Sequence, residues 1–166
     1  RMPHLSQTIS LLDLAGLFGE LAELAAPPEQ ASEEVFLWLQ RSLYNLKDEK
    51  HPHWYTLCAI LEVLELLGLS LAFPNEPVPA QYWFSPADGG FITNNDKGGP
   101  NSMAKLASPE AILTFKRAKS KEAMTKSDLG NWAICTTMLG DFLHYHLERL
   151  PKAWPMYIKS INKRSL

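Results

Sequence analysis

The chain has 166 residues, of which 46% are hydrophobic and 20% charged, as in an ordinary globular domain with one core. No apolar run approaches the roughly 20 residues that span a bilayer, and the start lacks a signal-peptide pattern, so we expect a cytoplasmic protein. Only two cysteines occur, Cys58 and Cys135, which excludes a zinc site of four thiolates. We expect both to be buried thiols, although the sequence leaves a disulfide between them open.

The net charge of −2 is unevenly distributed along the chain. Residues 1–110 hold 6 Lys/Arg and 14 Asp/Glu, whereas residues 111–166 hold 10 Lys/Arg and 4 Asp/Glu. A basic last third suggests an acidic partner or nucleic-acid phosphates. The alternative is that the two parts neutralise each other within one fold. Glu62 and Glu65, on one face of a predicted helix, are suited to pair with the basic part.

Two helices are predicted at the start of the chain. The first covers residues 6–25, where Phe18 and several leucines follow the spacing of one buried face, and Pro27-Pro28 ends it. The second follows Ser32, a good N-cap residue. Its predicted buried stripe consists of Phe36, Leu39, Leu43 and Leu46, flanked by partly buried Trp38 and Tyr44.

A third helix and a hairpin come next. Pro52 suits the first turn of the helix, and Gly68 suits the left-handed residue that closes it. Residues 74–101 are rich in Pro, Gly and Asn and contain two aromatic or β-branched runs around an Asp88-Gly89 turn, which predicts a β-hairpin. So small a hairpin needs helices to pack against.

Three more helices are predicted after the hairpin. Ser108-Pro109 begins the fourth, which runs to about residue 118. Ser127 or Asp128 caps a long fifth helix that reaches Leu150, and Trp154-Pro155 opens a short sixth through Ile161, followed by a basic tail, Lys163-Arg164. The predicted fold class is therefore mainly α: a bundle of about six helices with one small β-hairpin inserted at residues 74–101.

Three segments, in this order and spacing, carry a family resemblance. Residues 60–69 (ILEVLELLGL), 84–92 (FSPADGGFI) and 145–152 (YHLERLPK) resemble, respectively, the Leu-Gly helix end, the finger-like insertion and the closing helix of the RecO family of DNA repair and recombination mediators. The resemblance covers nearly the whole chain. It implies one helical domain over residues 1–166, the C-terminal helical part of such a mediator.

The sequence departs from the family pattern in two places. Family members have an OB-fold domain before the helical part, and nothing in this chain matches that barrel; either the chain is a fragment or Met2 begins a reduced relative. Many members bind zinc through two Cys-x-x-Cys pairs around the hairpin, but no cysteine occurs from residue 59 to 134. We therefore expect no metal and no cofactor, and a hairpin held by packing of some of its aromatic residues: Tyr82, Trp83, Phe84 and Phe91.

The resemblance implies a binding protein rather than an enzyme. Such mediators bind single- and double-stranded DNA, anneal complementary strands, engage RecR, and bind the acidic C-terminal tail of single-stranded-DNA-binding protein (SSB) through the helical domain. We therefore expect a cytoplasmic, nucleoid-associated location. The alternative is a stand-alone interaction module, such as an adaptor or immunity protein, that binds no DNA; the acidic net charge and the missing OB-fold favour it.

An SSB-tail receptor requires cations for carboxylates and an apolar notch for the terminal side chain. The candidate cations are Lys116, Arg117, Arg149 and Lys152, and the candidate notch residues are Phe115, Leu150 and Trp154. Candidates for contacts to DNA phosphates are Lys119, Lys121 and Lys126. In each set the plain alternative is solvated charge near a helix end or in a loop.

The histidines form two His-x-His pairs, His51 with His53 and His144 with His146. Residues two apart on a helix point about 200° from each other, so neither pair is suited to hold one metal ion. No nucleophile motif or phosphate-binding glycine loop occurs. We expect His146 to pack in the core.

Overall fold

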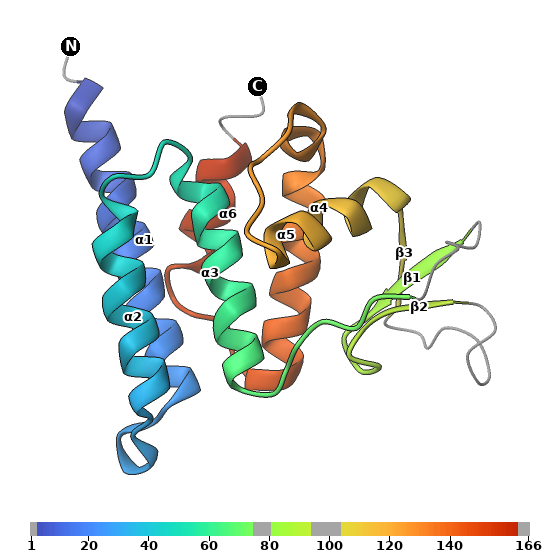
Figure 1. The fold of residues 1–166 in the computed structure, drawn as a ribbon, viewed down its shortest axis with the longest axis horizontal. Coiled ribbons are helices and arrows are strands. Elements are labelled where there is room, and N and C mark those ends of the chain that lie inside the picture. The colour runs from blue at the N-terminus through green and yellow to red at the C-terminus, as the bar shows by residue number, and fades with distance from the viewer. Residues whose placement is uncertain (1–2, 75–80, 94–103, 163–166) are drawn as a thin grey trace.

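The computed structural model describes residues 3–74, 81–93 and 104–162 (Figure 1). The predicted basic tail and the outer parts of the 74–101 insertion lie outside the described residues. Within the described part there are six α-helices, one 3₁₀ turn (η1, Pro28–Gln30) and one small sheet. The helices are α1 (Pro3–Ala25), α2 (Glu33–Leu46), α3 (Pro52–Leu66), α4 (Pro109–Lys119), α5 (Lys126–Leu147) and α6 (Trp154–Asn162).

The helices form a block with the sheet attached at one end (Figure 1). The antiparallel pair α1 and α2 lies at the end away from the sheet. Helices α3, α5 and α6 lie between this pair and the sheet. Helix α4 connects the sheet to this block and packs on α5. The mainly α fold class and the number of helices predicted from the sequence are confirmed.

The N-terminal pair confirms one predicted helix face and corrects the other. The α1 stripe is buried at Leu14, Leu17, Phe18 and Leu21. In α2 the Ser32 side chain accepts the Val35 N–H as predicted. The predicted stripe was correct at Leu46 and, in part, at Leu39, but wrong at Phe36 and Leu43, which are exposed. The buried α2 residues are Val35, Trp38, Ser42 and Leu46.

The cause of that error lies in the sequence of α2, where residues 35–39 are all apolar. Because consecutive residues of a helix point in different directions, this apolar run does not show which face of α2 is buried. Trp38 decides between them, because it is fully buried and its Nε1–H donates to the Ala59 carbonyl of α3 at 2.9 Å. Phe36, Leu43 and Tyr44 are left facing solvent.

Helix α3 is the central element of the block, and ten of its fifteen residues are buried. Pro52 occupies the first turn, and Gly68 closes the helix with φ of +72°, as the sequence predicted. A helix that contacts α1, α2 and α4 at once needs apolar side chains nearly all round.

The predicted hairpin is present as β1 (Tyr82–Ser85) and β2 (Gly90–Thr93), paired antiparallel. A third strand that the sequence did not reveal, β3 (Lys105–Ala107), pairs with the other edge of β1. Gly90 cannot be replaced without a shift, because a Cβ there would lie 2.6 Å from the Ala72 carbonyl oxygen.

Aromatic packing attaches the sheet to the helices, as expected for a hairpin without zinc ligands. Tyr82, Phe84 and Phe91 are buried and Trp83 is half-buried. The Phe84 ring stacks at 6.4 Å on Phe115 of α4, and Phe91 meets the same ring at 5.7 Å. These ring contacts link the hairpin to the helical bundle.

Helix α5 begins and ends slightly differently from the prediction. Its N-cap is Thr125, and Asp128 is the N3 residue of a capping box instead of the cap. The helix ends at Leu147 and not at Leu150, because Glu148 takes the left-handed conformation with φ of 64°. Helix α6 begins at Trp154 as predicted.

Both cysteines belong to the hydrophobic core of the described structure. Cys58 and Cys135 are free and buried, and burial raises the pKa of each thiol to about 12. Among these residues no group of three His, Cys, Asp or Glu side chains is arranged to hold a metal ion. None of their helices is both long and apolar enough to cross a membrane.

Candidate partner-binding surface

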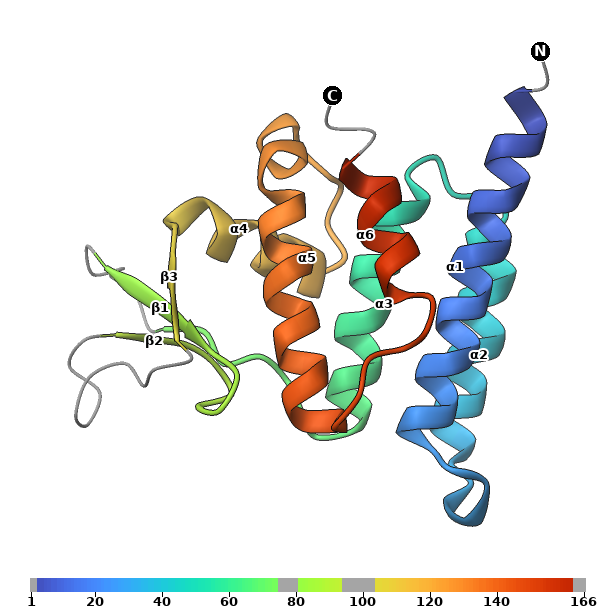
Figure 2. The ribbon, with the colours of Figure 1, turned by 180° about the vertical axis from the view of Figure 1, so that it is seen from behind.

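The connection between α5 and α6 is tied to α1. The Glu20 carboxylate of α1 accepts the backbone N–H of Lys152 through one oxygen and that of Ala153, at 3.1 Å, through the other. Pro151 is buried next to them. These contacts fix residues 149–153 in one place on the helical block (Figure 2).

Trp154 anchors the end of this connection and is not a surface residue. It is 2% exposed, and its ring lies 5.3 Å from Tyr157. Gly140 of α5 provides the space, since a Cβ there would lie 2.7 Å from the indole Nε1. The assignment of Trp154 to an open apolar notch is therefore corrected: its role here is to position the connection.

Arg149 and Lys152 are the two free cations of this connection. Both are exposed, and among the described residues neither side chain takes part in an ion pair. Leu150 lies between them and is half-buried against the core.

The cations of α4 lie in a different environment. Arg117 forms an ion pair with the buried carboxylate of Asp128, donating from Nε at 2.9 Å and also from Nη2. Lys116 is half-buried. Phe115 is fully buried beneath the sheet, so it too is corrected as a notch residue.

Asp128 is a buried carboxylate that accepts hydrogen bonds from Arg117, Thr114 and Thr125. Burial alone would raise its pKa, but the hydrogen bonds from Arg117, the Thr125 N–H and the Thr114 hydroxyl prevail and hold the pKa far below its ordinary value. The interaction explains why Arg117 is present in a mostly buried region: it neutralises this carboxylate.

The lysines predicted to contact DNA differ in how far they are engaged. Lys119 lies 3.4 Å from the Glu65 carboxylate and Lys121 lies 3.1 Å from that of Glu62. The expected pairing of those two acids with the basic part of the chain is thus confirmed. Lys126, at the start of α5, is exposed and joins no ion pair among the residues described.

The structure does not bring the predicted charges into one site. Helix α4 lies on the face seen in Figure 1, whereas the α5–α6 connection crosses the opposite face, seen in Figure 2. Lys116 and Arg117 therefore belong to another surface than Arg149 and Lys152. Sequence spacing gave no information on this separation, because it depends on how α5 packs between the two segments.

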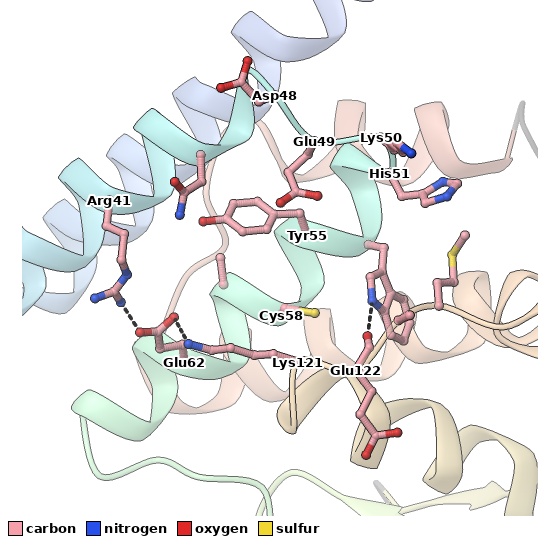
Figure 3. A pocket seen from close by; sticks show the side chains of 15 residues that line it. Arg41, Asp48, Glu49, Lys50, His51, Tyr55, Cys58, Glu62, Lys121 and Glu122 are labelled. Carbon is pink, nitrogen blue, oxygen red and sulfur yellow. Dashed lines mark hydrogen bonds and ion pairs between the residues drawn. The ribbon is translucent and has the colours of Figure 1, made fainter.

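A groove of about 640 Å³ was not foreseen from the sequence (Figure 3). It lies between the end of α2, the start of α3 and the α4–α5 loop, and its walls include Tyr55 and the side of Cys58. The indole of Trp54 donates to the Glu122 carbonyl at 3.0 Å and joins α3 to the loop. The charged turn at residues 47–50 was its one sequence signal.

The charges of the groove largely compensate one another. Glu62 pairs with both Arg41 and Lys121 across its floor (Figure 3). Three cations of the lining face four carboxylates, from Asp48, Glu49, Glu62 and Glu122. An acidic peptide would meet more negative than positive charge there, so the groove is less suited to it than the 149–152 connection.

The two histidine pairs separate as their spacing predicted. His51 is exposed, while His53 is buried, with its ring nitrogen Nε2 2.7 Å from the Ser160 hydroxyl of α6. His144 is exposed, and His146 is half-buried with Nε2 2.9 Å from the Pro86 carbonyl. His146 thus packs against the hairpin turn and Phe142, at the edge of the core.

Comparison with known proteins places this fold in a family. A protein named DNA repair protein RecO, from Desulfatibacillum aliphaticivorans, is 29% identical over 165 aligned residues, which cover 91% of this chain and 63% of the relative. The chain therefore spans less than two thirds of that relative's length. No solved structure matches this chain.

The family match covers most of the architecture described above. Residues 6–155, from α1 into the first residues of α6, match the family described as "Recombination protein O C terminal". The matched part includes the hairpin without cysteines and the connection that carries Arg149 and Lys152. The family is one of non-enzymatic recombination mediators. The chain thus belongs to the RecO C-terminal domain family.

Proposed function

We propose that residues 1–166 act as one helical domain, with residues 74–101 as its hairpin insertion, that binds the partners of a RecO-type mediator of DNA repair and homologous recombination. The observation that supports this most is the family match over residues 6–155. The proposed partners are the acidic C-terminal tail of SSB, RecR, and single- and double-stranded DNA. Such a protein works at the nucleoid in the cytoplasm.

Arg149 and Lys152 are the proposed contacts for the carboxylates of the SSB tail. Both are exposed cations on a connection held rigidly by Glu20 and Trp154, so little side-chain and loop ordering opposes binding. Leu150 remains the proposed apolar contact. Lys116 stays a candidate for a separate contact on the α4 face, and Arg117 is the weakest candidate because Asp128 already neutralises it.

Lys126 is the proposed main contact to DNA phosphates on this chain. To contact phosphates, Lys119 and Lys121 would first have to give up their ion pairs with Glu65 and Glu62. This reduces the free energy that each lysine contributes to DNA binding. DNA binding is expected to be independent of sequence, since it rests on charge without base contacts.

Affinity for an oligonucleotide, measured as a function of salt, tests this function. We expect the logarithm of the association constant to fall linearly with the logarithm of the salt concentration. Lys126→Ala is expected to reduce the magnitude of this slope by about one. Lys105→Ala is the matched control, because Lys105 is exposed but already paired with Asp141 at 2.6 Å; its slope should not change. An unchanged slope for Lys126→Ala would contradict the assignment of that lysine.

The second candidate is an interaction module that binds proteins only. The solvent-facing apolar side chains of α2 favour it, since such faces mark protein–protein contacts. The same titration separates the candidates: a module of this kind shows no affinity for either form of DNA at low salt, where electrostatic binding is strongest.

A further inference from the structure

The outer face of α2 carries large apolar side chains that nothing in the described structure covers. Phe36 is 62% exposed, Leu37 49%, Leu43 39% and Tyr44 67%. They lie on the side of the helix opposite the buried residues Trp38 and Ser42, at the outer end of the helical block (Figure 1). With Gln40 at its centre, this stripe runs the length of the helix, and we call it the α2 outer face. Its members are Glu33, Phe36, Leu37, Gln40, Leu43, Tyr44 and Lys47.

The residues of the α2 outer face follow the spacing of a helix-packing seam. The steps from Glu33 to Leu37, Gln40, Tyr44 and Lys47 alternate between four and three residues. This alternation is the pattern by which one helix presents a continuous edge to another. The face is therefore suited to another helix.

The order of residues along this face is complementary to itself when reversed. If two copies of α2 lie antiparallel with Gln40 opposite Gln40, Phe36 lies opposite Tyr44 and Leu37 opposite Leu43. At each end Glu33 of one copy lies opposite Lys47 of the other. A parallel arrangement would place like charges together at both ends, Glu33 on Glu33 and Lys47 on Lys47.

We propose that the α2 outer face binds a second copy of this chain, with the two α2 helices antiparallel about a twofold axis at Gln40. Two carboxamides that meet at the axis can exchange hydrogen bonds, because each has a donor and an acceptor. The antiparallel helix dipoles add to the attraction between the acidic first turn and Lys47. The Lys47 ammonium already lies 4.3 Å from the Tyr44 ring centroid, so the cation and the aromatic contact are on one edge of the face.

The size of the face sets the strength of this dimer. A helix of 14 residues is about 21 Å long, so one helix pair buries less than the ~1,200 Å² typical of stable complexes. The dimer is therefore weak, and it forms in the micromolar range. Arg41 is not required for it, because its guanidinium pairs with Glu62 on the flank toward the groove.

Charge exchange between two variants of the full chain tests both partner and orientation. In Glu33→Lys both ends of the dimer have Lys opposite Lys47, and in Lys47→Glu both have Glu opposite Glu33. Analytical ultracentrifugation over a concentration series should show each variant alone as a weaker dimer than the native chain, by about tenfold or more. An equimolar mixture should recover the native affinity, because each end then joins Lys to Glu.

Two controls separate this result from altered folding. Glu34→Lys makes the same charge change in the same helical turn but off the face, and it should dimerise like the native chain. Phe36→Ala should weaken the dimer while circular dichroism remains unchanged, since Phe36 contributes nothing to the core. Two results would overturn the proposal: a native chain that stays monomeric into the high-micromolar range, or a mixture whose dimer affinity is no higher than that of each variant alone. The first result would indicate that this face binds a different protein.

Discussion

Replacing Asp128 with alanine lowers the free energy of unfolding by about 3 kcal/mol, measured by denaturant titration. The substitution leaves the Arg117 guanidinium, the Thr114 hydroxyl and the Thr125 N–H without their acceptor. The Thr114 hydroxyl is buried, so water cannot easily replace the lost carboxylate there. It also removes the capping box of α5. Asp141→Ala is the control: its pair with Lys105 is exposed on both sides, so the loss should stay below about 1 kcal/mol.

The stabilisation by Asp128 depends on pH in a defined direction. The pKa of Asp128 is lower in the folded chain than its ordinary value of 3.8. Its contribution is therefore complete above that value and is lost as the pH falls below it. The difference in free energy of unfolding between the native chain and Asp128→Ala should therefore shrink as the pH is lowered below about 4. A difference that stays constant down to acid denaturation would contradict this reading of the ion pair.

Replacing Trp154 with alanine is expected to cost about 3 to 5 kcal/mol of stability. The indole fills the space between α5 and α6 and touches Tyr157 and Gly140. Its loss leaves a cavity that neither helix can close. The midpoint of urea unfolding measures the effect, and the SSB-tail affinity should fall as well, because the connection with Arg149 and Lys152 loses its anchor.

Gly140 lies on the other side of this contact, and together with Gly130 of the same helix it provides a matched pair of glycine-to-alanine variants. Alanine normally stabilises a helix relative to glycine by about 1 kcal/mol. At Gly130, where an added Cβ meets nothing within 4 Å, we expect that gain. At Gly140 the Cβ would lie 2.7 Å from the Trp154 Nε1, so the sign reverses. Equal effects at the two glycines would show that α6 does not pack as described.

Much of the fold was predictable because local chemistry marks the ends of elements. Ser32, Pro52, Gly68 and Ser108 each specify a helix boundary through one hydrogen bond or one backbone conformation, and all four lie where predicted. The aromatic hairpin was predictable in the same way, from its turn residues.

What the sequence did not reveal depends on contacts between distant segments. Strand β3 has only three residues and is a strand because it meets β1, far from it in the sequence. The face of α2 was decided by Trp38 reaching Ala59. Phe115 and Trp154, which look like surface anchors beside cations, are core residues because the sheet covers the first and α5 covers the second.

The proposed site was predictable only in part for the same reason. The basic character of the last third was evident, but which cations remain free depends on the acids they meet in the fold. Glu62, Glu65 and Asp128 engage Lys121, Lys119 and Arg117. Arg149 and Lys152 meet no such carboxylate among the residues described.

The most direct test is the binding of a fluorescent peptide with the C-terminal sequence of the SSB tail, followed by anisotropy. We expect micromolar binding that weakens with salt, and that weakens about tenfold in Arg149→Ala and in Lys152→Ala. Lys126 is also an exposed cation, at the start of α5, and Lys126→Ala should bind the peptide like the native chain. Absence of binding at any salt, or native affinity in both connection variants, would contradict the proposal that this domain receives the tail at residues 149–152.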